Sequence, residues 1–136
     1  MIERQILARL LHDEDFLRKT LPFIKAEYFN NRVDKTVYSL IESFVKDYNK
    51  PPTKSALLIE ADKGSEYDEE TFSQIVEVIG ALNEDNTDQQ WLVDQTEKFC
   101  QDRAIYNAIM SSIQILDGRD TKNSKGSIPQ ILSDAL

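Results

Sequence analysis

The only histidine of this 136-residue sequence stands beside three acids, and this is the group whose residue types most suggest chemistry. His12 is followed by Asp13, Glu14 and Asp15, and hard cations such as Ca²⁺ do bind carboxylates. The acids are adjacent, however, and lack the alternating spacing of a calcium-binding loop. Acids at a helix start are also stabilised by the helix dipole. We therefore interpret the cluster as a solvated helix start and predict no metal ligand.

No arrangement for nucleophilic catalysis or for phosphate binding is evident either. A cysteine nucleophile would need Cys100 to meet His12, but Cys100 lies on the apolar stripe of a predicted helix, which is typical of a buried, unreactive thiol. The glycines fit neither the ATP-binding P-loop nor the dinucleotide-binding pattern. We therefore predict no catalytic, cofactor-binding or metal-binding residues, and we expect that this chain is not an enzyme by itself. The glycines are Gly64, Gly80, Gly118 and Gly126.

The net charge of −8 is unevenly distributed along the chain. Residues 60–88 contain ten acids and one base, Lys63, so they carry −9 and the rest of the chain sums to +1. This segment repels nucleic acid and is either a solvated acidic face or a docking surface for a basic protein. Arg119, Lys122 and Lys125 lack interleaved aromatic residues, so we predict no direct nucleic-acid binding.

The apolar residues recur at helical spacing, and only four Gly and four Pro interrupt them, so the predicted fold class is all-α. Helices are expected at about 2–11, 32–48, 68–82, 88–116 and 128–136, with short helices around Phe16 and after Thr53. The predicted N-caps are Asp13 or Asp15, Asn30 or Asn31, Thr53, Asp68, Thr87 and Ser127. No apolar run approaches the ~20 residues that span a bilayer, and a single cysteine fits a reducing compartment. The sequence thus predicts a soluble, cytoplasmic protein with no membrane contact.

The longest predicted helix indicates self-association. The short link at residues 83–86 predicts an antiparallel hairpin over about 67–116, after a bundle over about 1–64. A helix of this length exceeds 40 Å, more than the roughly 30 Å diameter of such a domain, so one end should project. We predict that a stripe along it pairs with a second copy, although the helix could instead be packed inside its own domain. The stripe residues are Leu92, Phe99, Tyr106 and Ile113.

The end of the sequence predicts a linker at residues 117–127 and a short last helix at 128–136. That helix is below the ~12–15 residues at which an isolated helix is marginal, so it must dock to be ordered. Its apolar pattern is interrupted at the last residue, and we expect more polypeptide to follow. The predicted docking residues are Ile128, Pro129, Ile131, Leu132 and Leu136.

The order of several short segments over about 110 residues resembles the N-terminal region of DnaB-like replicative helicases, most closely those of T-even-type phages. Many bacterial members carry histidine where this chain has Asp34-Lys35, so bacterial partner contacts are not transferred. The resembling residues are Glu27-Tyr28-Phe29, Leu40-Ile41, Pro52, Trp91-Leu92-Val93, Thr96-Glu97-Lys98, Gln101, Arg103-Ala104, Asn107-Ala108, Gly126, Ile128-Pro129, Ile131 and Ala135-Leu136.

The resemblance implies a collar domain whose copies pair within a hexameric ring. It also implies motor domains after residue 136 that bind ATP and Mg²⁺, unwind duplex DNA and make most DNA contacts. Primase and the helicase loader would dock on the collar in the infected bacterial cell. Residues 127–136 would begin a linker helix that packs against the neighbouring subunit's motor domain. The alternative is a stand-alone helical adaptor or regulatory protein-binding module.

Overall fold

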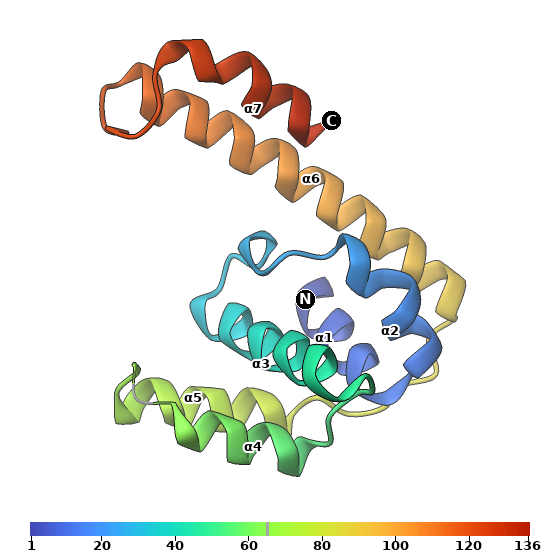
Figure 1. The fold of residues 1–136 in the computed structure, drawn as a ribbon. Coiled ribbons are helices and arrows are strands. Elements are labelled where there is room, and N and C mark those ends of the chain that lie inside the picture. The colour runs from blue at the N-terminus through green and yellow to red at the C-terminus, as the bar shows by residue number, and fades with distance from the viewer. Residues whose placement is uncertain (65) are drawn as a thin grey trace.

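The computed structural model describes residues 1–64 and 66–136, and every regular element in that part of the chain is helical. The predicted all-α class is confirmed. In the same described part, no helix is long and apolar enough to cross a membrane. The elements are α1 (Ile2–His12), α2 (Glu14–Thr20), η1 (Leu21–Phe23), η2 (Ala26–Tyr28), α3 (Arg32–Tyr48), α4 (Lys54–Lys63), α5 (Glu69–Gly80), α6 (Gln89–Leu116), η3 (Lys125–Ser127) and α7 (Ile128–Ala135), where η denotes a 3₁₀ helix (Figure 1).

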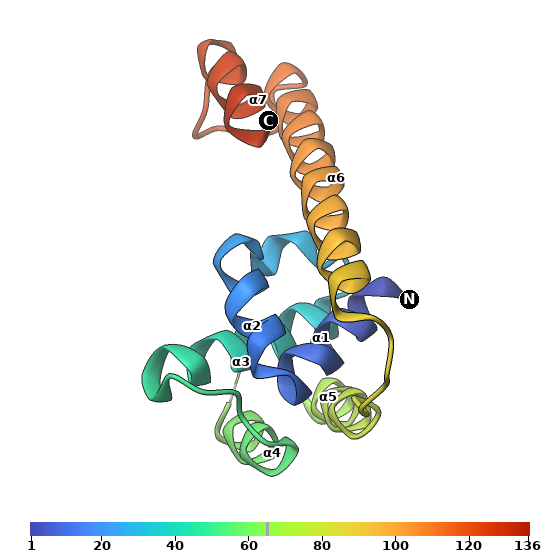
Figure 2. The same cartoon turned by 90° about the vertical axis from the view of Figure 1, so that its right-hand side faces the viewer.

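The core lies in a bundle made by α1 to α5 and the first half of α6. Helix α3 packs against α1, α4 and α5, while α1 and α2 pack against α6. The second half of α6 and all of α7 extend beyond the bundle in both views (Figures 1 and 2). The largest fully buried side chains are Tyr38, Phe16, Phe29, Ile6, Leu7, Leu10, Leu17, Ile41, Leu57, Ile75, Ile79 and Leu82.

Most helices begin where a short polar side chain caps them, as the sequence predicts. Four caps accept a hydrogen bond from the second or third amide of their helix: Asp13, Asn31, Thr53 and Asp68. The predicted cap at Thr87 is wrong, because Asp88 accepts from the Trp91 amide at 2.9 Å and starts α6. The Thr87 amide donates instead to Asp85, at 2.9 Å. Ser127 makes no side-chain cap bond to α7.

The predicted hairpin of residues 67–116 is wrong. Helix α5 packs against α3 and α4 and contributes Ile75 and Ile79 to the core, so the bundle does not stop at residue 64. The link between α5 and α6 runs past the end of α1, where the buried Arg9 donates to Asp85 and to the carbonyl of Thr87. These bonds direct α6 away from α5 and along α1 and α2 (Figure 2).

The hairpin that does form joins α6 to α7. Gly118 follows α6 with φ of +75°, a left-handed conformation that glycine adopts without a steric penalty, and turns the chain. Residues 119–124 carry it round so that α7 lies back along α6 (Figure 1). The short last helix therefore docks on α6 of its own chain, and its contact with a neighbouring subunit stays a prediction.

Candidate protein-docking face on the long helix

Helix α6 has two halves in different surroundings. The first half belongs to the bundle, where Leu92, Thr96 and Cys100 are buried. Burial raises the pKa of the Cys100 thiol to about 12, so this thiol is protonated and unreactive at neutral pH. In the second half the buried residues are Ala108, Ser112 and Ile115. Because this half packs against α7, its small residues allow the two helices to approach closely.

Six large apolar side chains of the projecting half remain exposed to solvent. They occupy the side of α6 next to the one that α7 covers, so the helix is apolar around most of its circumference there. A helix of that kind is normally covered by other protein, and exposed apolar side chains gathered on one face of it mark an interaction site. We call these residues the α6 face: Ile105 (38% exposed), Tyr106 (51%), Ile109 (47%), Met110 (39%), Ile113 (43%) and Leu116 (58%).

The structure separates the four residues of the predicted self-association stripe. Tyr106 and Ile113 lie in the α6 face. Leu92 is fully buried, and Phe99 packs in the bundle with its ring centroid 5.9 Å from that of Phe29, so the prediction is wrong for these two. The seven-residue repeat continues unchanged while the surroundings of α6 change from core to solvent.

The predicted stripe did not include the other four residues of the α6 face, which are Ile105, Ile109, Met110 and Leu116. The sequence feature that could have predicted them is the four-residue spacing of Ile105, Ile109 and Ile113, which places three isoleucines along one edge of a helix.

The five predicted docking residues of the last helix also divide. Ile128 and Ile131 are half-buried on the side toward α6. Pro129 and Leu132 are exposed on the outer side, and Leu136 is 95% exposed. Helix α7 therefore has one apolar edge covered by α6 and a second apolar edge open to solvent.

Two segments that carry the family resemblance meet where α6 leaves the bundle. The Arg103 Nε donates to the carbonyl of Tyr28 at 3.0 Å, and the Asn107 Nδ2 donates to the carbonyl of Glu27 at 3.1 Å. Phe29 next to them is fully buried and stacks on Tyr38, with ring centroids 5.1 Å apart. The two hydrogen bonds join residues that are 75 and 80 positions apart in the sequence. We call the place where Arg103 and Asn107 bond to the backbone of Tyr28 and Glu27 the joint.

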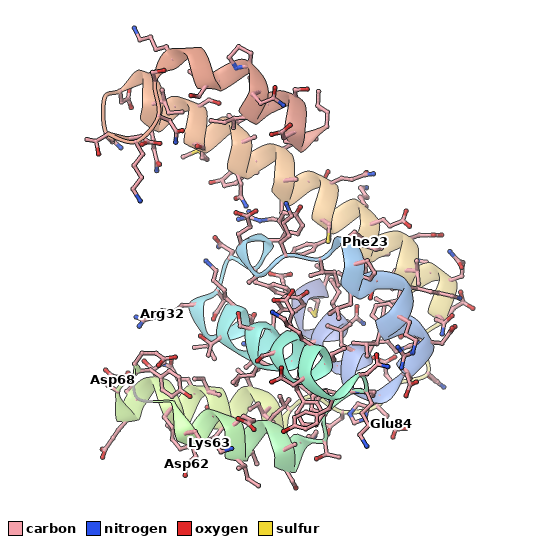
Figure 3. The ribbon with its side chains drawn as sticks, in the orientation of Figure 1. Phe23, Arg32, Asp62, Lys63, Asp68 and Glu84 are labelled. Atoms are coloured by element: carbon pink, nitrogen blue, oxygen red, sulfur yellow. The ribbon has the colours of Figure 1, made fainter. Side chains whose placement is uncertain are left out.

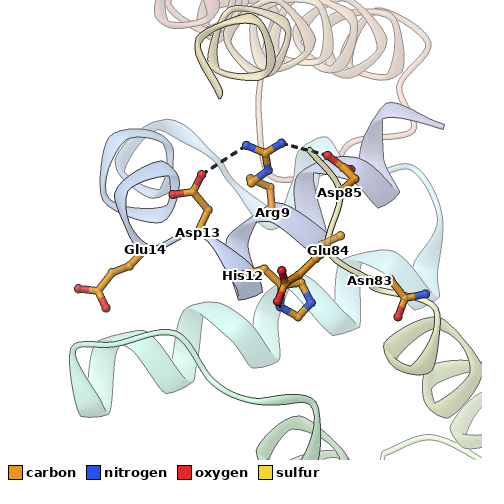
Figure 4. A pocket seen from close by; sticks show the side chains of 8 residues that line it. Arg9, His12, Asp13, Glu14, Asn83, Glu84 and Asp85 are labelled. Atoms are coloured by element: carbon orange, nitrogen blue, oxygen red, sulfur yellow. Dashed lines mark hydrogen bonds and ion pairs between the residues drawn. The ribbon is translucent and has the colours of Figure 1, made fainter. Parts of the chain in front are cut away.

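The acid-rich cluster at the first helix has a structural role in holding the link before α6. Arg9 lies between Asp13 and Asp85 and pairs with them at 3.3 and 3.0 Å (Figure 4). These residues line a hollow of about 290 Å³. The His12 Nε2 lies 2.8 Å from the carbonyl of Leu82, to which it donates. These side chains are thus engaged with one another and with the backbone of the link.

Asp13 and Asp85, the two aspartates that pair with Arg9, both favour the charged form. Burial raises the pKa of Asp13, but hydrogen bonds from the Phe16 amide, Gln89 and Arg9 outweigh it and lower the pKa overall. The amide of Thr87 and the guanidinium of Arg9 lower the pKa of Asp85.

The acidic helices α4 and α5 lie at the opposite end of the molecule from the projecting half of α6 (Figure 1). Helices α4 and α5 form the layer farthest from α7, and Asp62 and Asp68 project from it (Figures 1 and 3). Lys63 pairs with Glu60 at 3.4 Å, but most acids of this layer extend into solvent. The two surfaces could therefore be occupied at the same time, and docking of a basic protein on this one stays a prediction.

The fold and the open face define an all-α domain that leaves one side of a long helix uncovered. No family model matches the chain. The chain is 33% identical to a DnaB-like replicative helicase of Enterobacteria phage T4. The alignment is 139 residues long and covers 96% of the chain. The chain spans 29% of that protein's length. The resemblance to DnaB-like replicative helicases is confirmed, and the match is consistent with an N-terminal domain of such a helicase.

Proposed function

We propose that this chain is the N-terminal collar domain of a hexameric, DnaB-like replicative helicase. In this role it associates with other copies of itself and provides surfaces on which partner proteins dock. The similarity to the phage T4 helicase over nearly the whole chain supports this function. The position of the α6 face on a projecting helix supports the self-association.

The α6 face is the observation that carries the proposal. Its six residues are between 38% and 58% exposed and lie on the projecting half of α6, which packs mainly against α7. A two-fold contact uses the same surface on both partners, so one apolar face is sufficient. Two α6–α7 hairpins pairing in this way form a four-helix bundle, in which each copy covers the other's exposed isoleucines.

The remaining activities belong to the proposed full-length protein. Motor domains after residue 136 would bind ATP and Mg²⁺ and unwind duplex DNA at the replication fork, in the cytoplasm of the infected bacterium. Primase and the helicase loader are the proposed partners of the collar. This chain would contact neither DNA nor ATP directly.

Sedimentation of the isolated domain tests the self-association. We expect the wild type to form dimers or weak higher species at tens of micromolar. Ile109→Glu should remain monomeric, because pairing would bury its charge against apolar side chains without a partner. Gln114→Glu is the matched control, since it adds the same charge to an exposed position of α6 outside the α6 face. Circular dichroism should show that both variants keep their helices.

A wild-type chain that stays monomeric up to millimolar concentration would exclude this assembly. The full reading frame and the activity of the complete protein distinguish the helicase collar from the alternative, a stand-alone helical adaptor. ATP-dependent unwinding by the complete protein supports the helicase collar. A reading frame without a motor domain supports the adaptor.

A further inference from the structure

Arg103 contacts both the bundle and the α6 face. Its Nε donates to the carbonyl of Tyr28, and its Nη2 donates to the Asn107 Oδ1 at 3.4 Å. The guanidinium also lies over the Tyr106 ring, 4.7 Å from the ring centroid. One side chain therefore links the backbone of η2 to an aromatic residue of the α6 face.

The bundle holds the projecting half of α6 through few contacts beyond Cys100. Ala104 packs against the edge of the core, and the next contacts are the hydrogen bonds that Arg103 and Asn107 make to η2. Hollows of about 230 and 340 Å³ lie beside η2, between it and the end of α7, and both are lined by Tyr28, Ala104 and Ala135. Helix α7 packs mainly against α6 and η3, so the joint is the main connection between the hairpin and the bundle.

We infer that Arg103 is a positioning residue that couples pairing at the α6 face to the orientation of the α6–α7 hairpin. The inference rests on the self-association proposed above. When a second copy covers Tyr106, the Arg103–Tyr106 contact loses water, and a cation on an aromatic ring binds more strongly without water. Arg103 is then held in the rotamer that also bonds Tyr28.

This coupling acts in both directions, because the free energy that couples pairing to the bonds of the joint is the same whichever of the two forms first. Pairing should stiffen the joint, and a joint held by Arg103 should favour pairing. In an assembled ring, all hairpins would then project from their bundles at one angle.

Distances between spin labels, measured by double electron–electron resonance, test the inference. One label is placed on the bundle at Ser55→Cys and one on the hairpin at Gln114→Cys, both exposed positions. Cys100 is 5% exposed, so it does not compete for the label. The doubly labelled protein is diluted into an excess of unlabelled protein, so that only distances within one copy are recorded.

We expect one distance peak in the wild type, and we expect it to narrow as the total concentration passes through the pairing transition. Arg103→Met keeps an unbranched apolar side chain but removes the guanidinium with its donors and charge, so its distance distribution should be broad at every concentration and its pairing weaker. Gln101→Met is the matched control, because it makes the same polar-to-Met change two residues earlier on α6. It should behave as the wild type.

An Arg103→Met distribution as narrow as that of the wild type would overturn the inference, and so would a wild-type peak whose width does not change on pairing. Sedimentation of the same samples distinguishes these results from a failure of self-association, in which no sample pairs at all. If Arg103→Met does not fold, Asn107→Leu takes its place. That variant loses the bond to Glu27 and should also broaden the distribution.

Discussion

At the scale of single residues, Arg9 is a nearly buried charge with three partners. Its side chain is 9% exposed and makes ion pairs with Asp13 and Asp85 as well as a hydrogen bond to the carbonyl of Thr87. Removing one member of a well-buried ion pair is strongly destabilising, because it leaves the other charge without a partner. Arg9 thus fixes the position from which α6 starts.

Asp85→Asn should lower the stability at pH 7 by about 1 kcal/mol, because it removes a charge-assisted bond that partial exposure to solvent already weakens. The pKa of Asp85 is lowered in the folded chain, so its contribution is present above the unfolded pKa of about 4 and is lost as the pH falls through the lower folded pKa. The difference in urea midpoint between wild type and variant should therefore shrink below about pH 4.

Asp62→Asn is the control, since it changes an exposed aspartate of α4 in the same way. A midpoint difference for Asp85→Asn that is constant from neutral to strongly acidic pH would contradict this role for its carboxylate.

At the scale of elements, α7 depends on α6 for its order. It has eight residues, none of which is buried, and its contact with α6 is made through the half-buried Ile128, Ile131 and Ala135. A helix of this length does not persist alone in water, so its stability comes from docking. It should be the part of the fold that opens most easily.

Ile131→Asp should release α7 without unfolding the bundle. Losing the burial of about half an isoleucine and placing a charge there costs at least about 1.4 kcal/mol, which lowers the amide-exchange protection of residues 128–135 by about tenfold or more. Hydrogen exchange resolved by residue measures this. Ser133→Asp, on the exposed side of α7, is the control. Equal protection losses in α3 and α7 would show that the hairpin and the bundle open together.

At the scale of the whole molecule, the buried and the open apolar surfaces are separated in space. The bundle encloses its core, whereas the α6 face lies on the part that projects beyond it (Figure 2). Pairing of copies would therefore add stability without rearranging the bundle. Any partner that binds the folded state alone raises the midpoint of thermal unfolding by mass action.

The wild-type Tm should accordingly rise with protein concentration across the range in which copies pair. Ile113→Asp, which places a charge in the α6 face, should make the Tm independent of concentration and leave its value at high dilution close to that of the wild type. Scanning calorimetry at several concentrations measures both. A wild-type Tm that stays constant over that range would contradict stabilisation by pairing.

The sequence by itself determined the local structure of this protein. Apolar spacing gave the helices, and α3 begins and ends at the predicted residues. Short polar side chains identified the caps at Asn31 and Asp68, because a cap depends on amides two or three residues away. The ordered segments that resemble DnaB-like helicases were also visible without a structure.

Only the tertiary structure decided which neighbour covers each helix face. Periodicity assigns residues to one side of a helix, but it contains no information on what lies against that side. Leu92 and Tyr106 share a stripe, yet one lies in the core and the other in solvent. The position of α6 on the bundle follows from contacts across long sequence separations, such as Arg9 with Asp85 and Arg103 with Tyr28. Such contacts exist only once the chain has folded, so the α6 face and the joint could not be located beforehand.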